Sequence, residues 1–132
     1  MKLTREEILK YIDMAIEVRE NAYTPYSMFK VGAVVIGDNG NVVRGANIEN
    51  ASYGLSNCAE RSAIFSALSQ GVKKIEGIVV VADTTGPVSP CGACRQVIKE
   101  FATDDITIVL ANLNKDYKVM TMEELLPYGF EL

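Results

Sequence analysis

The pattern of apolar and polar positions predicts a helix at the N-terminus, followed by a β-hairpin. Residues 4–7 (Thr-Arg-Glu-Glu) form a capping-box pattern, which is typical of a helix start. Apolar positions then recur at helical spacing, at Ile8, Tyr11, Ile12 and Ala15. The apolar run 31–36 predicts a strand. Turn chemistry at 37–40 (Gly-Asp-Asn-Gly) then predicts a hairpin, with 41–46 as its returning strand.

The middle of the chain predicts a second helix and two buried strands. After a polar connection over residues 47–57, helical spacing begins near Cys58 and ends before Gly71, a residue suited to the position just past a helix. The runs 78–82 and 106–110 are almost wholly apolar and rich in β-branched residues. Such runs are typical of strands that are buried on both faces of a sheet.

The remaining segments complete an α/β pattern. Ser89 and Pro90 fit the N-cap and the first position of a third helix. Residues 117–120 fit a short strand, and residues 122–126 fit a final helical turn. Helices alternating with buried strands predict a three-layer α/β/α sandwich around a mixed sheet of roughly five strands. The length of 132 residues fits one domain, residues 1–132.

Composition and charge narrow the classes of function. The net charge is -4, whereas nucleic-acid-binding proteins need a basic surface, so a nucleic-acid partner is disfavoured. The first ten residues lack the apolar stretch of a secretory signal, and no run is long enough to cross a bilayer. We therefore expect a cytoplasmic protein without a membrane partner. The chain has no histidine, which excludes Ser-His-Asp and Cys-His catalysis.

The three cysteines carry the strongest chemical information in the sequence. Cys91 and Cys94 are three positions apart, so both sulfurs would face one side of a helix start. Cys58 would add a third sulfur from another helix start, and three protein ligands with one open position are typical of a catalytic zinc site. Glu60 would lie beside the metal-bound water and carry its proton. Arg61 would donate hydrogen bonds to the electron-rich sulfurs.

Each of these residues also has a simpler interpretation. Cys91 and Cys94 could be a redox-active pair of the thioredoxin type, and Cys58 could be an ordinary buried residue. Glu60 could only cap its helix, because residues 57–60 (Asn-Cys-Ala-Glu) also match a capping box. A purely structural zinc site would need a fourth protein ligand, and the sequence has no further cysteine or histidine to supply it.

Several segments together resemble the small homo-oligomeric cytidine deaminases, over nearly the whole chain. Residues 58–60 (Cys-Ala-Glu) and 90–94 (Pro-Cys-Gly-Ala-Cys) match the signature of zinc-dependent nucleobase deaminases. More specific to cytidine deaminases are residues 47–50 (Asn-Ile-Glu-Asn) and the segments 26–33 and 89–96. The resemblance implies a single cytidine-deaminase-like catalytic domain that holds one zinc ion.

The reaction implied by the resemblance is hydrolysis of a C–N bond in a cyclic amidine. Zinc-bound hydroxide would attack C4 of the cytosine ring, Glu60 would shuttle the protons, and ammonia would leave. Cytidine and 2′-deoxycytidine would become uridine and 2′-deoxyuridine, which is the chemistry of pyrimidine salvage. A deaminase of nucleoside antibiotics or of cytosine in polynucleotides stays an alternative, although the acidic charge disfavours a polynucleotide.

The resemblance also implies which residues bind the nucleoside. Asn47 and Glu49 would hold the ribose hydroxyls. Backbone groups of Ala59 and Ser89 would read the edge of the base, and Phe29 would line the pocket.

The same resemblance implies a shared active site. Members of this family are usually homotetramers. Phe130 near the C-terminus would pack on the base bound by a neighbouring subunit, and Tyr53 would lie at the same boundary between subunits.

Overall fold

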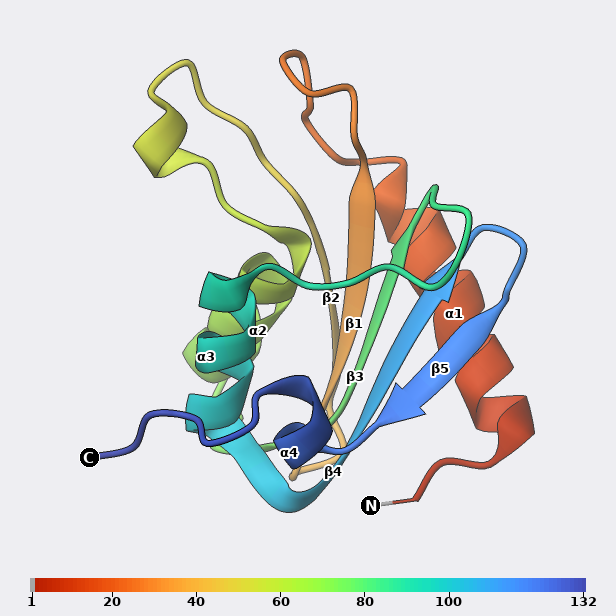
Figure 1. Cartoon of the computed structure of the whole chain (residues 1–132), viewed down its shortest axis with the longest axis vertical. Helices are drawn as coiled ribbons and strands as arrows, with labels where there is room; N and C mark the ends of the chain where they lie inside the picture. The colour runs from red at the N-terminus through yellow and green to blue at the C-terminus, as the bar shows by residue number, and fades with distance from the viewer. Residues whose placement is uncertain (1) are drawn as a thin grey trace.

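The computed structural model describes residues 2–132, which fold around one mixed five-stranded sheet (Figure 1). The strand order is β2-β1-β3-β4-β5, in which β3 and β4 are parallel and every other neighbouring pair is antiparallel. The predicted antiparallel hairpin is confirmed as β1 and β2. The strands are β1 (Val31–Gly37), β2 (Val42–Ala46), β3 (Ile75–Ala82), β4 (Ala102–Asn112) and β5 (Tyr117–Met120).

Helices cover both faces of the sheet. One face carries α1, and the other carries α2, α3 and the short α4 (Figure 1). The predicted three-layer α/β/α sandwich is therefore confirmed. No helix within residues 2–132 combines the length and the apolar character that crossing a membrane requires. The helices are α1 (Arg5–Arg19), α2 (Ala59–Ser69), α3 (Gly92–Phe101) and α4 (Met122–Leu125), with a 3-10 turn, η1 (Tyr53–Leu55), between β2 and α2.

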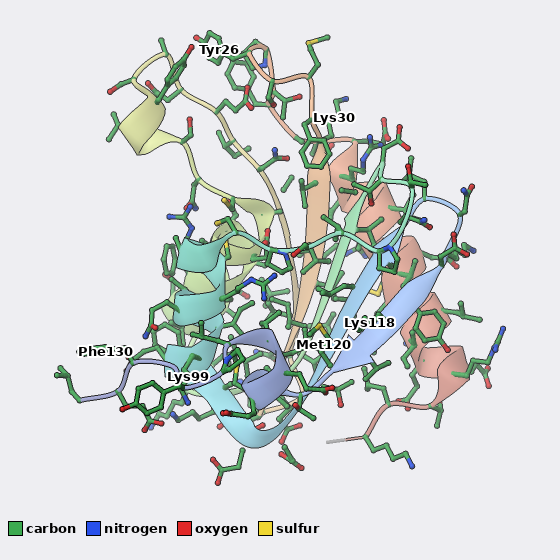
Figure 2. All side chains as sticks on the ribbon, in the orientation of Figure 1. Tyr26, Lys30, Lys99, Lys118, Met120 and Phe130 are labelled. Atoms are coloured by element: carbon green, nitrogen blue, oxygen red, sulfur yellow. The ribbon has the colours of Figure 1, made fainter. Side chains whose placement is uncertain are left out.

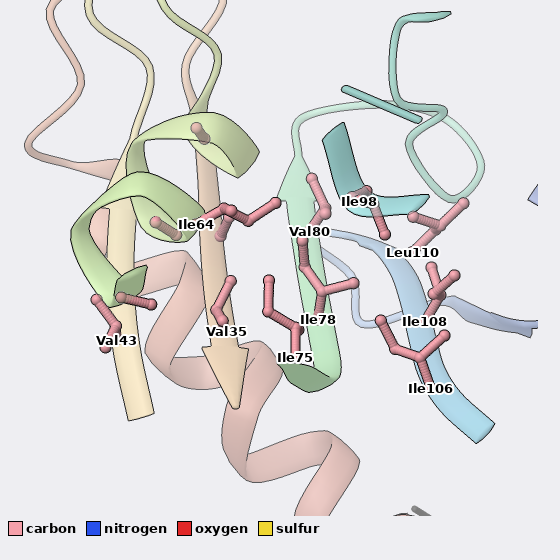
Figure 3. Packing of buried hydrophobic residues seen from close by; sticks show 14 of the residues in the cluster. Val35, Val43, Ile64, Ile75, Ile78, Val80, Ile98, Ile106, Ile108 and Leu110 are labelled. Atoms are coloured by element: carbon pink, nitrogen blue, oxygen red, sulfur yellow. The ribbon is translucent and has the colours of Figure 1, made fainter. Parts of the chain in front are cut away.

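Alternating side chains divide the hydrophobic core into two layers. In β1, Ala33 and Val35 pack into the layer below α2 and α3, whereas Val34 and Ile36 pack below α1. The two central strands β3 and β4 alternate in the same way, which explains why their sequences are apolar at consecutive positions. Figure 3 shows the layer below α2 and α3, with labelled residues that include Val35, Ile64, Ile78, Val80, Ile98, Ile108 and Leu110.

The start of α3 differs from the prediction. Cys91, and not Ser89, is the N-cap, with extended backbone angles of φ −68° and ψ 165°. The Ser89 hydroxyl instead accepts a hydrogen bond from Arg95 Nη2 at 2.6 Å, and Pro90 lies before the helix. The prediction of Ser89 as N-cap is therefore wrong. Its hydroxyl binds the side chain of Arg95, which lies inside the helix, and does not cap the helix start.

A glycine allows α2 to lie directly against β2. A Cβ atom on Gly45 would stand 2.8 Å from both the carbonyl oxygen of Ala59 and the Cα atom of Ala63, closer than real Cβ contacts occur. These neighbours are backbone atoms, so they could not move aside without shifting the helix. Since Ala59 is the first residue of α2, this close contact lies at the start of the helix, next to Cys58.

Candidate active site

Three sulfur atoms converge at the starts of α2 and α3. Cys58 is the N-cap of α2, Cys91 is the N-cap of α3, and Cys94 lies buried in the first turn of α3. The three Sγ atoms all lie within 4.8 Å of one another, and those of Cys58 and Cys91 are 3.9 Å apart. Residues 33 positions apart in sequence thus meet because two helices begin side by side.

This arrangement of donors fits a zinc ion. Sulfur ligands on a tetrahedral zinc with bonds of 2.3 Å stand about 3.8 Å from each other, close to the separation of Cys58 and Cys91. The group that could hold a metal within residues 2–132 consists of these three thiols and does not include Glu60. Three protein ligands leave a position for water or substrate, as in catalytic zinc sites.

The helix starts and Arg61 favour negative charge on the sulfurs. Free backbone N–H groups at a helix start carry a partial positive charge, and Cys58 and Cys91 each occupy the N-cap of a helix. Arg61 Nη2 donates a hydrogen bond to Cys58 Sγ at 3.1 Å. The hydrogen bond from Cys94 and then the Arg61 guanidinium lower the pKa of Cys58 to about 5. The same hydrogen bond holds the proton on Cys94 and, together with burial, raises the pKa of Cys94.

Glu60 is a buried carboxyl beside the thiols. It lies in the first turn of α2, is only 4% exposed, and is within hydrogen-bonding reach of Cys94. Burial raises the pKa of Glu60, and the negative charge of Cys58 adds to this effect. The capping-box interpretation is wrong, because Cys58 is the N-cap and the Asn57 amide donates to Ser62 Oγ at 3.3 Å. A buried carboxyl with a raised pKa next to a metal site is suited to proton transfer.

Glu49 lines a cavity formed by two loops. Its carboxylate accepts hydrogen bonds from the backbone N–H groups of Tyr26 at 3.0 Å and Ser27 at 3.2 Å, and from the Ser27 hydroxyl. The hydroxyl and then these N–H groups lower the pKa of Glu49, so the carboxylate is charged. The cavity has a volume of about 430 Å³ and is lined by Tyr26, Ser27, Glu49, Tyr53 and Ser56.

Asn47 joins the end of β2 to the segment that leads into β1. Its side-chain oxygen accepts from the backbone N–H of Val31 at 2.8 Å, and its amide nitrogen donates to the carbonyl of Phe29 at 2.8 Å. The Phe29 ring is 42% exposed. Asn47 and Glu49 thus both contact the segment 26–31, one at each end. Isolated bridges from Ile48 to Tyr23 and Asn57 connect these loops to the start of α2.

The two aromatic residues that the resemblance assigns to a subunit boundary lie apart. Tyr53, 77% exposed, packs edge-on against Tyr26 with ring centroids 6.1 Å apart, at the Glu49 cavity. Phe130, 66% exposed, lies in the C-terminal segment beside α3, where it lines a separate cavity of about 490 Å³. Figure 2 shows Tyr26 in the protruding loops and Phe130 well away from it. One chain alone therefore does not bring Phe130 to Glu49.

Sequence reasoning assigned no role to Ser27 or Arg95, although both make polar contacts at this end of the molecule. Ser27 holds Glu49, and Arg95 binds the segment that leads into Cys91. Both lie within the segments that carry the family resemblance, 26–33 and 89–96. Membership in those segments was the only cue in the sequence that could have drawn attention to them.

Comparison with known proteins supports the same family. Residues 5–110 match the family model of the cytidine and deoxycytidylate deaminase zinc-binding region. Cytidine deaminase from Halalkalibacterium halodurans is 56% identical over 119 residues, covering 90% of each chain. Cytidine deaminase from Sporosarcina psychrophila is 48% identical over 124 residues, covering 94% of this chain and 91% of that protein. The crystal structure of cytidine deaminase from Burkholderia pseudomallei has 47% identity and a TM-score of 0.89, covering 97% of this chain and all of the other. On this evidence, and with a three-thiol site that can hold zinc, the chain belongs to the cytidine and deoxycytidylate deaminase family.

Proposed function

We propose that this protein is a zinc-dependent hydrolase that deaminates cytidine and 2′-deoxycytidine to uridine and 2′-deoxyuridine. The observation that carries the proposal is the meeting of three thiols and one buried carboxyl at the adjacent starts of α2 and α3. Zinc held by Cys58, Cys91 and Cys94 would act as the Lewis acid that makes water nucleophilic at neutral pH. Residues 1–132 act as one domain, and the reaction serves pyrimidine salvage in the cytoplasm.

Glu60 moves the protons of this reaction. The carboxylate accepts a proton from the attacking water and delivers it to N3 of the pyrimidine ring. It then takes the remaining proton from the hydroxyl added at C4 and passes it to the amine at C4, so that the C4=O bond forms as the C4–N bond breaks and ammonia leaves. Burial raises the pKa of Glu60, so that the group can hold a proton between these steps and still release it. Arg61 keeps the sulfur charge from weakening the pull of the metal, because it donates a hydrogen bond to Cys58.

The nucleoside lies between the thiols and the two protruding loops. The charged Glu49 carboxylate and the Asn47 amide bind the ribose hydroxyls, and for Glu49 this role is supported by the cavity that it lines. The backbone N–H of Ala59, at the first position of α2, has no acceptor within its helix and is free to bind the base. The backbone of Ser89 contacts the same base edge, and Phe29 lines the pocket.

An assay with free nucleosides tests the proposed function. Zinc-loaded protein should deplete the cytosine absorbance band of cytidine and of 2′-deoxycytidine, and metal analysis should find about one zinc ion per chain. Protein stripped of zinc by a chelator should be inactive and should regain activity when zinc returns. No turnover of either nucleoside by zinc-loaded protein would contradict the proposal. A metal-free protein with a Cys91–Cys94 disulfide would support a redox function instead.

The active site is completed by a second copy of the chain in a homotetramer. Phe130 is exposed in the single chain and far from its own Glu49 cavity, and Tyr53 stands exposed at the rim of that cavity. Phe130→Ala should therefore raise KM for cytidine roughly tenfold through the loss of aromatic packing on the base, without loss of zinc. Steady-state kinetics and metal analysis measure both effects. A fully active monomer in light scattering would rule out shared sites.

A further inference from the structure

Arg95, in α3, binds two separate segments of the chain through one guanidinium group. Nε donates to the carbonyl of Pro90 at 2.9 Å, Nη2 donates to Ser89 Oγ at 2.6 Å, and Nη1 donates to the carbonyl of Leu125 at 2.5 Å. Each of the three guanidinium nitrogens therefore donates one hydrogen bond, in a geometry that a lysine side chain cannot reproduce. Hydrogen bonds from a charged donor are stronger than those between neutral groups.

The Leu125 side of this contact is a fixed point. Leu125 ends α4, so its carbonyl has no partner within the helix, and its side chain is 1% exposed in the core. The start of α4 is closed by a complete capping box between Thr121 and Glu124. Arg95 thus links the end of α4, which is held in the core, to Ser89 and Pro90 in the loop before α3.

The other side of the contact is a segment that is held by the burial of Val88 and Pro90 and by few hydrogen bonds. Within residues 2–132, the structure gives Ser89 Oγ and the Pro90 carbonyl no hydrogen-bond donor other than Arg95. Pro90 has no N–H group of its own with which to anchor the backbone. The next backbone contact towards the N-terminus is from the N–H of Val88 to the carbonyl of Ala111, at 3.2 Å. Arg95 therefore supplies the hydrogen bonds that orient the two residues before Cys91.

We propose that Arg95 is a positioning residue of the active site. It holds Cys91 where the three sulfurs can share one zinc ion, and it holds the Ser89 backbone where the pyrimidine binds. The role of Cys91 rests on the three-thiol metal site, and the role of Ser89 rests on the function proposed above. Arg95 itself touches neither the metal nor the substrate. It acts through the two residues that precede Cys91.

The rate of zinc release distinguishes a residue that positions Cys91 from a residue that only stabilises the fold. Zinc-loaded Arg95→Gln should lose its metal to an excess of a chelating dye about tenfold faster than the unaltered protein, in line with the effect of removing groups that orient metal ligands. Arg44→Gln is the matched control. The same substitution there removes only an exposed ion pair with Glu17 of α1, 3.2 Å long, on the opposite face of the sheet from α2 and α3. Its zinc release should be unchanged. If folded Arg95→Gln released zinc at the control rate, the proposal would be wrong.

A second variant distinguishes the geometry of the Arg95 hydrogen bonds from the effect of its positive charge. It also provides a more conservative substitution in case Arg95→Gln does not fold. Arg95→Lys keeps the positive charge and the aliphatic stem but cannot bind three acceptors at once. We expect it to release zinc faster than the unaltered protein as well, and in excess zinc we expect KM for cytidine to rise about tenfold in both variants. Release at the unaltered rate in Arg95→Lys would mean that charge alone suffices, and would overturn the proposal. If the protein did not turn over cytidine at all, the proposed function would fail, but zinc release would still decide the role of Arg95.

Discussion

Replacing Glu60 with glutamine should lower the turnover of cytidine by about 10²–10⁴-fold, the range over which a positioned acid-base group contributes. Glutamine has the same shape as glutamate but cannot accept and return a proton. Glu60 is buried, and burial raises its pKa, so its surroundings favour a neutral side chain and glutamine fits that space. The loss should therefore appear in kcat, while the fold and the zinc content stay as they are.

The measurements for Glu60→Gln are kcat from the absorbance assay, zinc per chain from metal analysis, and the thermal unfolding midpoint. Glu17→Gln is a matched control, because the same chemical change falls on an exposed carboxylate that pairs with Arg44. This control should keep full activity. Turnover by Glu60→Gln above a tenth of the unaltered value would show that another group moves the protons.

The fold could be predicted from the sequence where one local pattern dominated. Consecutive apolar residues in β3 and β4 mark strands with two buried faces, and the turn at 37–40 marks the hairpin. The start of α3 could not be predicted in this way. Ser89 is a good N-cap by residue type, but Arg95 takes its hydroxyl, and nothing in the local sequence reveals that contact.

The cluster of three thiols could be predicted for a different reason. An odd number of cysteines, with one Cys-x-x-Cys pair and one distant cysteine, favours a metal site over a disulfide framework. The prediction of nucleoside-binding residues depended on the family resemblance. Without it, Asn47 and Glu49 would be interpreted as parts of a polar turn. Arg95 and its partner Leu125 are 30 positions apart, so their contact follows from how α4 packs on the sheet. Sequence spacing carries no information about such a contact.

Replacing Cys58 with alanine should remove the zinc ion, although this cysteine is remote in sequence from the other two. Loss of one of three protein ligands should weaken zinc binding by more than the roughly 100-fold upper range found for groups that only support a ligand. Turnover should fall with the bound metal. Arg61 would also lose its sulfur partner, so the guanidinium would no longer stabilise a thiolate at this point.

Thermal unfolding with and without added zinc distinguishes a metal ligand from an ordinary buried residue. A ligand that binds only the folded state at 100 times its Kd stabilises it by about 2.7 kcal/mol, so zinc should raise the Tm of the unaltered protein. The Tm of Cys58→Ala should not respond to zinc. Ser66→Ala provides a matched control, since it removes a half-buried polar atom from the same helix and should keep the zinc response. If Cys58→Ala kept one zinc ion per chain and the full shift in Tm, Cys91 and Cys94 would hold the metal without it. The open coordination position and the proton-transfer role of Glu60 would then lose their structural basis.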